Sequence, residues 1–199
     1  MYAQCSAPDR AVMLRRYRLV DIAHRVVGVG SVGTRAYLAL LIGNTDNDPL
    51  FLQIKECVSP AHAPYLPTLP KQFLEHQGKR VVTGQRILQA TSDVMLGETT
   101  VDGRPFFVRQ MKNMKGGMDV TGLTGETYYL YAQNCGALLA RAHARGGDAA
   151  AISGYVGKSE ALDNALATWG EAYAGQTEQD HECLVKAIKA GAVKAVQGV

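Results

Sequence analysis

Apolar and polar residues alternate along most of the first half of the chain, a pattern typical of strands with one buried face. The alternation is clear over residues 34–42, where Ala36, Leu38 and Leu40 share one face. An Asp102-Gly103 pair between two such segments predicts a tight hairpin turn. Strands are predicted at residues 21–29, 34–42, 50–57, 93–99 and 104–112.

One helical segment interrupts these strands. Leu74, Val81 and Leu88 fall on one stripe and predict a single helix over residues 71–91. Glu75 is the one carboxylate in that segment and would lie in its first turn.

The second half of the chain has the period of helices. Helices are predicted at residues 126–145 and 149–154, the second capped by Asp148, followed by a long helix capped by Ser159. In the long helix the spacing predicts a buried apolar stripe, formed by Leu162, Leu166, Trp169 and Tyr173.

These elements predict an α+β fold: an antiparallel sheet of about five strands with one helix, followed by an α-helical part. Met114-Lys115-Gly116-Gly117 breaks the pattern. We therefore expect a sheet lobe at residues 1–115 and a helical lobe, itself only partial, at residues 116–199.

The candidate chemistry centres on the glycines of the segment Val26–Arg35, which have G-x-G-x-x-G spacing. Backbone N–H groups in such a loop, including that of Ser31, can cradle phosphate, and glycine lets the ligand approach closely. The same spacing occurs in dinucleotide folds, where a helix follows, and in kinase-type folds, where a strand follows. It also fits a glycine-rich hairpin without a ligand. The three glycines are Gly28, Gly30 and Gly33.

Two alternatives follow, and the alternation over residues 34–42 favours the first. In an antiparallel meander, Lys55 on the third strand would reach nucleotide phosphates, with Glu75 holding it in place. In a βαβ unit, Glu56 would bind a ribose hydroxyl. The residues also allow simpler roles: Lys55 as a strand lysine with its head in water, and Glu75 as a complement to the helix dipole.

Composition narrows the function. The 199 residues carry a net charge of +3, too mild to indicate nucleic acid as a partner. Four widely spaced cysteines predict reduced thiols rather than a metal site. Without a signal peptide or an apolar run of roughly 18 residues, we expect a cytoplasmic protein with no membrane partner. We expect a solvated strand face from the basic residues Arg104, Arg109, Lys112 and Lys115.

Several segments together resemble a large bacterial family known only as a domain of unknown function, which is grouped near protein kinase-like and aminoglycoside phosphotransferase-like folds. The resemblance covers about residues 10–190. It rests on the segments 26–35, 48–56, 84–86, 108–112 and 139–145.

Full-length members of that family resemble a circularly permuted kinase fold, with catalytic-loop and metal motifs upstream of the glycine loop. This chain has neither motif, so the resemblance implies the C-terminal half of such a protein. Thr83 stands where many relatives carry an acid, which leaves the partner of Lys55 open.

The resemblance implies the ATP-binding half of a kinase-like phosphotransferase of unknown substrate, inactive alone and using magnesium only with the other half. Its partners would be the nucleotide and either the missing N-terminal half or a second copy, through exposed apolar surface. A dinucleotide-binding module and a non-catalytic folding or interaction domain are the alternatives.

Overall fold

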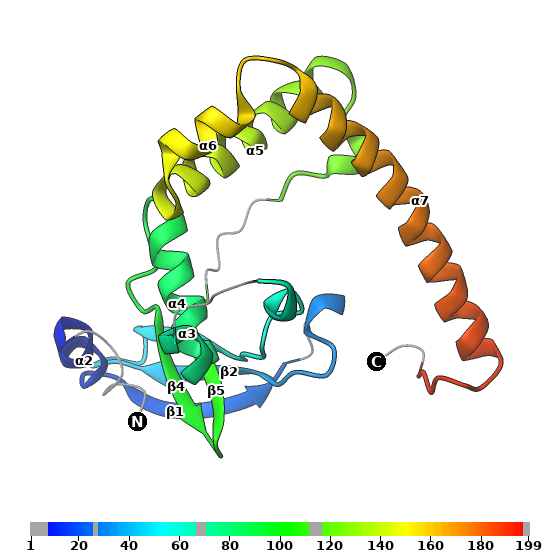
Figure 1. Cartoon of the computed structure of the whole chain (residues 1–199). Helices are drawn as coiled ribbons and strands as arrows, with labels where there is room; N and C mark the ends of the chain where they lie inside the picture. Colours follow the sequence, from blue (N-terminus) through cyan, green and yellow to red (C-terminus); the bar gives the residue numbers. More distant parts are fainter. Residues whose placement is uncertain (1–7, 26–27, 67–70, 112–116, 197–199) are drawn as a thin grey trace. The chain divides into compact units, whose positions relative to one another are not determined.

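The computed structural model of the chain describes residues 8–25, 28–66, 71–111 and 117–196. The fold is α+β as predicted, with a five-stranded antiparallel sheet followed by a largely helical C-terminal part (Figure 1). The chain divides into two compact units, Met1–Gly147 and Asp148–Val199. The predicted lobe boundary at 115/116 touches residues outside the described ranges and stays a prediction.

The sheet has the strand order β1-β2-β3-β5-β4, and all neighbouring strands are antiparallel. All five predicted strands are present, although β1 and β4 are displaced by three or four residues from the predicted starts at 21 and 93. In the β4–β5 turn, Asp102 has φ 49° and Gly103 φ 74°, the left-handed backbone for which an Asp-Gly pair is suited. The strands are β1 Arg18–His24, β2 Ala36–Ile42, β3 Pro49–Glu56, β4 Gly97–Val101 and β5 Arg104–Gln110.

Strand β2 decides between the two nucleotide folds considered above. It pairs along its whole length with β3, with Tyr37 opposite Ile54 and Ala36 opposite Lys55. A βαβ unit requires a helix at this point. The meander that the alternation favoured is therefore confirmed, and the βαβ alternative is wrong, because alternating apolar residues form a second strand here.

One face of the sheet carries the main core. Ala39, Leu52 and Val108 come from three neighbouring strands and are each at most 3% exposed. The short helix α2 (Pro8–Leu14) adds Leu14 to this cluster, and Met95 joins it from the segment before β4. This packing fixes the register, because slipping by one residue would turn the apolar set to the other face.

The predicted helix over residues 71–91 is two helices, α3 (Lys71–Glu75) and α4 (Gln77–Leu88). His76 separates them with an extended backbone, and its ring Nδ1 accepts a hydrogen bond from the N–H of Lys79 at 3.0 Å. A side-chain cap of this kind satisfies a backbone donor at a helix start. Periodicity alone did not predict this break. Because of the break, Glu75 is the last residue of α3 and does not lie in the first turn of one long helix.

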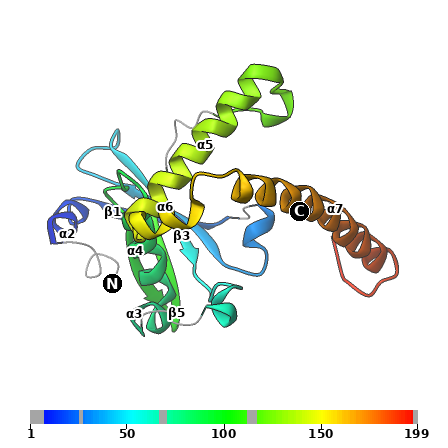
Figure 2. The same cartoon turned by 45° about the horizontal axis from the view of Figure 1, so that its top comes forward.

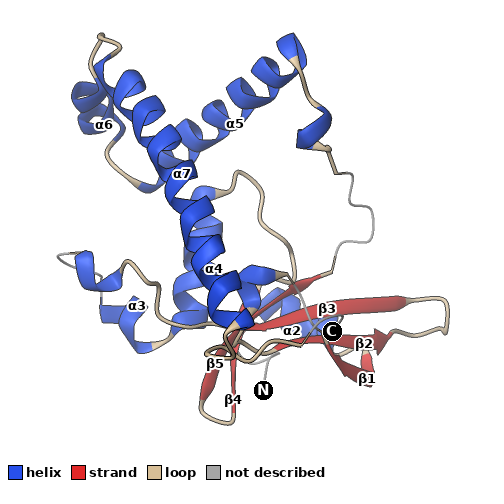
Figure 3. Ribbon diagram, turned by 90° about the vertical axis from the view of Figure 1, so that its right-hand side faces the viewer, coloured by secondary structure: helices blue, strands red, loops and turns tan. Residues whose placement is uncertain are grey.

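Helix α4 packs against β4 and β5 (Figure 3). Gly78 allows the close approach, since a Cβ there would lie 2.5 Å from the carbonyl oxygen of Phe106. The C-terminal end of α4 contacts α5 (Gly125–Gly146), where the Nε of Arg145 donates to the carbonyl of Ile87 at 2.9 Å. Short 3₁₀ turns lie at Ala63–Tyr65 and Val120–Gly122.

The second unit contains α6 (Ala149–Val156) and α7 (Ala161–Lys189), which follow one another along the chain (Figure 2). Asp148 caps α6 as predicted: its Oδ1 accepts hydrogen bonds from two backbone N–H groups at 2.9 and 3.0 Å. The predicted cap at Ser159 is wrong, since the residue before α7 is Glu160 and its side chain makes no capping bond.

The predicted apolar stripe of α7 exists but is not buried. Leu166, Trp169 and Tyr173 are 57%, 62% and 56% exposed, and the two aromatic rings stack with centroids 5.0 Å apart. The prediction of burial is wrong because periodicity identifies an apolar face without identifying what covers it. Among the described residues, every helix is too short or too polar to cross a lipid bilayer.

Candidate functional site

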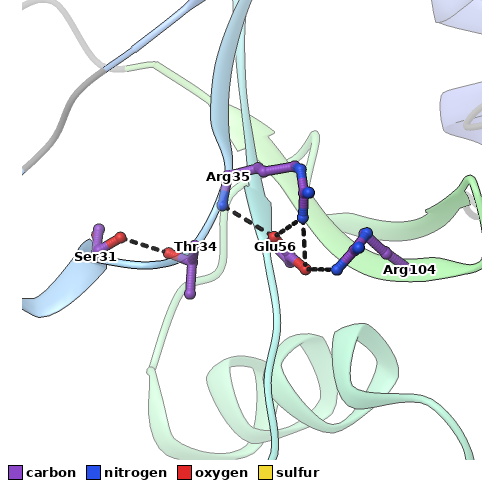
Figure 4. Close-up of polar contacts among 5 residues, drawn as sticks. All are labelled: Ser31, Thr34, Arg35, Glu56 and Arg104. Carbon is purple, nitrogen blue, oxygen red and sulfur yellow. Dashed lines mark hydrogen bonds and ion pairs between the residues drawn. The ribbon is translucent and has the colours of Figure 1, made fainter.

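The glycine segment connects β1 to β2 and contains a 3₁₀ turn, Val29–Ser31. The N–H of Ser31 donates to the carbonyl of Gly28 at 2.9 Å. The carbonyl of Ser31 accepts from both the N–H and the hydroxyl of Thr34, at 3.0 and 2.8 Å (Figure 4). Local hydrogen bonds therefore shape the loop and engage the Ser31 N–H, one of the donors predicted to face phosphate.

The three glycines of the segment differ in what the backbone requires of them. Gly33 has φ 81°, a conformation that side chains other than glycine rarely adopt. A Cβ at Gly28 or Gly30 would meet no heavy atom of the described structure within 4 Å. Packing thus requires glycine at neither position, and the space beside both is open to a ligand.

A cavity of about 380 Å³ lies beside this loop. Gly30 and Ser31 line it from the loop, and Lys55 lines it from β3, where it pairs with Ala36 and Phe107 on the neighbouring strands. The structure therefore brings together three of the predicted site residues. Gly28, Gly33 and Glu75 are not among the residues that line the cavity.

A second cation, Arg80, lines the same cavity from α4. Its Nε donates to Oε1 of Gln77 at 2.6 Å and its Nη2 donates to the carbonyl of Val58 at 3.2 Å. Arg80 was not predicted from the sequence, because the kinase pattern has an acid, not a base, in the helix after the lysine strand. A basic residue in that helix was the available signal.

Glu75 does not occupy the position expected for a lysine partner. It is exposed and ends α3, whereas α4 provides the helical wall of the cavity. The sequence of α4 contains no aspartate or glutamate, and Thr83 lies within it. The paired acid of the kinase pattern is thus absent from the helical wall of this cavity.

Glu56 is held by a network of its own (Figure 4). Its carboxylate accepts from the backbone N–H of Arg35 at 3.0 Å and forms ion pairs with the Nη1 atoms of Arg35 and Arg104, both at 3.2 Å. The backbone hydrogen bond from Arg35, followed by the guanidinium contacts, holds the pKa of this carboxyl below its usual range. With a side chain only 7% exposed, Glu56 of β3 is held by Arg35, the residue before β2, and by Arg104 of β5, so its carboxylate is already engaged rather than free for a ribose.

Cys57 follows Glu56 at the cavity wall. Its side chain is buried, and its Sγ donates to the carbonyl of Lys55 at 3.7 Å. Burial raises the pKa of the thiol, so it stays neutral near pH 7. Cys57 is thus a packing residue rather than a nucleophile.

The two basic residues of β5 differ in their exposure to solvent. Arg104 is half exposed and paired with Glu56, whereas Arg109 is half-buried, with its Nε donating to Oε1 of Gln53. Lys112 and Lys115 lie outside the described residues. The expectation of a solvated face therefore holds for Arg104, and only in part for Arg109, because Gln53 on the neighbouring strand supplies a partner that a linear sequence does not show. For Lys112 and Lys115 it stays a prediction.

Magnesium does not fit the cavity. The carboxylate that lines it, Glu56, is already bound by two arginines. Across the ranges that the structure describes, His, Cys, Asp and Glu side chains gather nowhere in groups of three that could hold a metal ion. The cavity instead offers cationic and hydroxyl groups, which suit a phosphate rather than a metal.

Comparison with known proteins identifies a family. The sequence model described as "Uncharacterized protein conserved in bacteria (DUF2252)" matches residues 1–187. No curated protein and no solved structure matches the chain.

Proposed function

We propose that this chain, which belongs to the DUF2252 family of proteins conserved in bacteria, is the nucleotide-binding part of a kinase-like phosphotransferase. One observation carries the proposal. The glycine loop between β1 and β2 and the lysine of β3, Lys55, line the same cavity, together with Arg80. Nucleotide sites of kinases combine a glycine-rich loop with a strand lysine in this way.

The strand arrangement supports the proposal. A glycine-rich connection joins two antiparallel strands, the lysine lies on the third strand, and α4 lies between the third and fourth strands in sequence. Kinase-type sites place the lysine and the neighbouring helix in the same relation. The chain departs from the pattern because α4, which carries Arg80, contains no aspartate or glutamate.

In the proposed site, Lys55 acts as a point charge on the phosphates of ATP, and the Arg80 guanidinium provides a second cation. Arginine and lysine both recognise phosphate, arginine through a planar fork. The open space beside Gly30 admits the phosphate chain close to the backbone. ATP supplies the phosphoryl group, and the residues of this cavity bind and orient it.

ATP and ADP affinity of four variants tests the proposal by calorimetry. Lys55→Ala and Arg80→Gln each remove a cation, and we expect each to weaken binding about tenfold or more, the effect of roughly 1.5–3 kcal/mol. Gly30→Val adds a side chain where no atom of the described residues lies within 4 Å of its Cβ, so it should weaken binding while leaving the melting temperature unchanged. Lys79→Ala, exposed and adjacent to Arg80, is the matched control and should bind normally.

Unchanged affinity in both Lys55→Ala and Gly30→Val would overturn the proposal. Thermal melts of all four variants separate loss of binding from loss of folding, which matters for Arg80 because it also bonds Gln77 and the Val58 carbonyl.

A second candidate function is an interaction module, favoured by the exposed stripe of α7. Trp169 and Tyr173 present a stacked aromatic pair, and such residues are enriched at protein interfaces. Its partner would be a separate N-terminal half or a second copy of the chain. Light scattering across a concentration series tests self-association. If a second copy is the partner, the molar mass rises with concentration and Trp169→Ser abolishes the rise; if the partner is a separate N-terminal half, the chain stays monomeric.

A further inference from the structure

A second cavity, of about 260 Å³, opens on the sheet face that carries Lys55. Gln53, two residues before Lys55 on β3, lines it together with Arg109 of β5. Gln85 of α4 and Gln89 just beyond that helix line it from above. Its walls are therefore mainly amide groups around one guanidinium.

Arg109 is held in a fixed orientation. Its Nε donates to Oε1 of Gln53 at 3.0 Å, and its guanidinium carbon lies 5.8 Å from the centre of the Phe107 ring. Gln53 is only 4% exposed, so this anchor is buried. Within the part of the chain that the structure describes, neither Nη atom of Arg109 has a protein acceptor. The planar fork is thus positioned while its outer edge is available.

The carboxylate of Asp93, at the wall of this cavity, forms no ion pair with Arg109 among the described residues. Its Oδ1 accepts from the N–H of Met95 at 2.8 Å, and its Oδ2 accepts from the N–H of Gln110 at 2.6 Å. Both oxygens are therefore occupied in shaping the segment before β4. The remaining polar side chains of the lining are neutral, from Gln85, Gln89, Thr91, Ser92 and Gln110.

We propose that this cavity is a binding site for a small organic monocarboxylate, anchored on Arg109. A guanidinium matches a carboxylate with two parallel hydrogen bonds. The volume falls below the roughly 300–1,000 Å³ of sites for drug-sized ligands, which suits a ligand much smaller than a nucleotide. The negative charge of Asp93 beside a single cation disfavours a phosphate dianion.

The site is independent of the proposed nucleotide site, because Arg109 and Gln53 line this cavity and Lys55 and Arg80 line the other. A negative result for one proposal therefore does not overturn the other.

Titration of the ¹⁵N-labelled full chain with sodium propionate tests the proposal by NMR, at constant ionic strength against sodium chloride. We expect a saturable shift of the Arg109 Nε–H signal and of the side-chain amides of Gln85 and Gln89. In Arg109→Gln the amide shifts should be lost or need at least tenfold more propionate. Arg141→Gln, an exposed residue of α5, is the matched control and should titrate like the unmodified chain.

Gln89→Glu is a second test that does not depend on whether Arg109→Gln folds. Gln89 is exposed and lines the cavity, so the substitution adds a negative charge there. It should weaken propionate binding at least threefold. Shifts that never saturate, or equal affinity in Gln89→Glu and the unmodified chain, would overturn the proposal. Tighter binding of inorganic phosphate at pH 8 than of propionate would also overturn it, in favour of a dianion site.

Discussion

Glu56 holds Arg35 by two separate groups. One oxygen of its carboxylate accepts from the backbone N–H of Arg35 at 3.0 Å and lies 3.2 Å from the guanidinium Nη1 of the same residue. Arg35 is the residue immediately before β2 and follows the glycine segment directly. The pair thus fixes the end of the glycine loop to the central strand that carries Lys55.

Removing the Glu56 carboxylate should destabilise the sheet. Glu56→Ala leaves the Arg35 N–H and two guanidinium groups without their acceptor, and we expect a loss of about 1–3 kcal/mol, moderated because both arginines are half exposed. Glu56→Gln should lose less, since its amide oxygen can still accept from the N–H. Urea unfolding measures both. The control, Glu75→Ala, removes an exposed carboxylate and should unfold like the unmodified chain.

The same carboxylate predicts how stability responds to acid. The pKa of Glu56 in the folded chain is lowered from its ordinary value of 4.5, so its charge favours folding at pH values above 4.5. That contribution is lost as the pH falls from 4.5 through the folded pKa. The difference in melting temperature between the unmodified chain and Glu56→Gln should therefore shrink as the pH is lowered below 4.5. A constant difference over this range would contradict the prediction.

Two glycines of α4 should respond oppositely to alanine. Gly78→Ala places a Cβ 2.5 Å from the backbone carbonyl of Phe106, which must move, and we expect a loss of about 1–3 kcal/mol. Gly84→Ala meets open space and should stabilise the helix by up to about 1 kcal/mol, because alanine has the higher helix propensity. Urea midpoints compare them directly. Equal shifts in the two variants would show that α4 does not approach β5 as described.

Local patterns predicted the elements that local forces determine. The alternation over residues 34–42 predicted β2, and the Asp102-Gly103 pair predicted the β4–β5 turn, since both depend on neighbouring residues alone. The helix break at His76 was not predicted, because a histidine ring caps α4 in place of the usual Ser, Thr, Asp or Asn side chain.

Partnerships across the sheet could not be predicted in the same way. Glu56, Arg35 and Arg104 are separated by 21 and 48 positions in sequence, yet they form one network because β3 pairs with both β2 and β5. The hydrogen bond of Arg109 was not predicted for the same reason, since its partner Gln53 lies on a different strand. Trp169 shows a different limit of prediction. The sequence predicted the apolar face of α7, but it did not show whether another element packs against that face.

The cysteines should differ in reactivity. Cys57 is buried and its pKa is raised, whereas Cys183 is exposed on α7. The thiolate is the reactive form, so Cys183 should be alkylated by iodoacetamide far faster than Cys57 at pH 7.5. Mass spectrometry of the peptides assigns each site separately. Equal rates would show that the wall of the Lys55 cavity opens freely in solution.

The chain should bind ATP without turning it over. Phosphoryl transfer needs metal ligands and a residue that positions the nucleophile, and the described residues contain no cluster of three potential metal ligands. Phosphate release in the presence of ATP and magnesium should stay at the level of the buffer for both the unmodified chain and Lys55→Ala. Activity that persists in Lys55→Ala would come from a contaminating ATPase, whereas steady hydrolysis that Lys55→Ala abolishes would contradict the prediction. In that event residues outside the described ranges must provide the missing groups, because the carboxylate at the cavity, Glu56, is already held by Arg35 and Arg104.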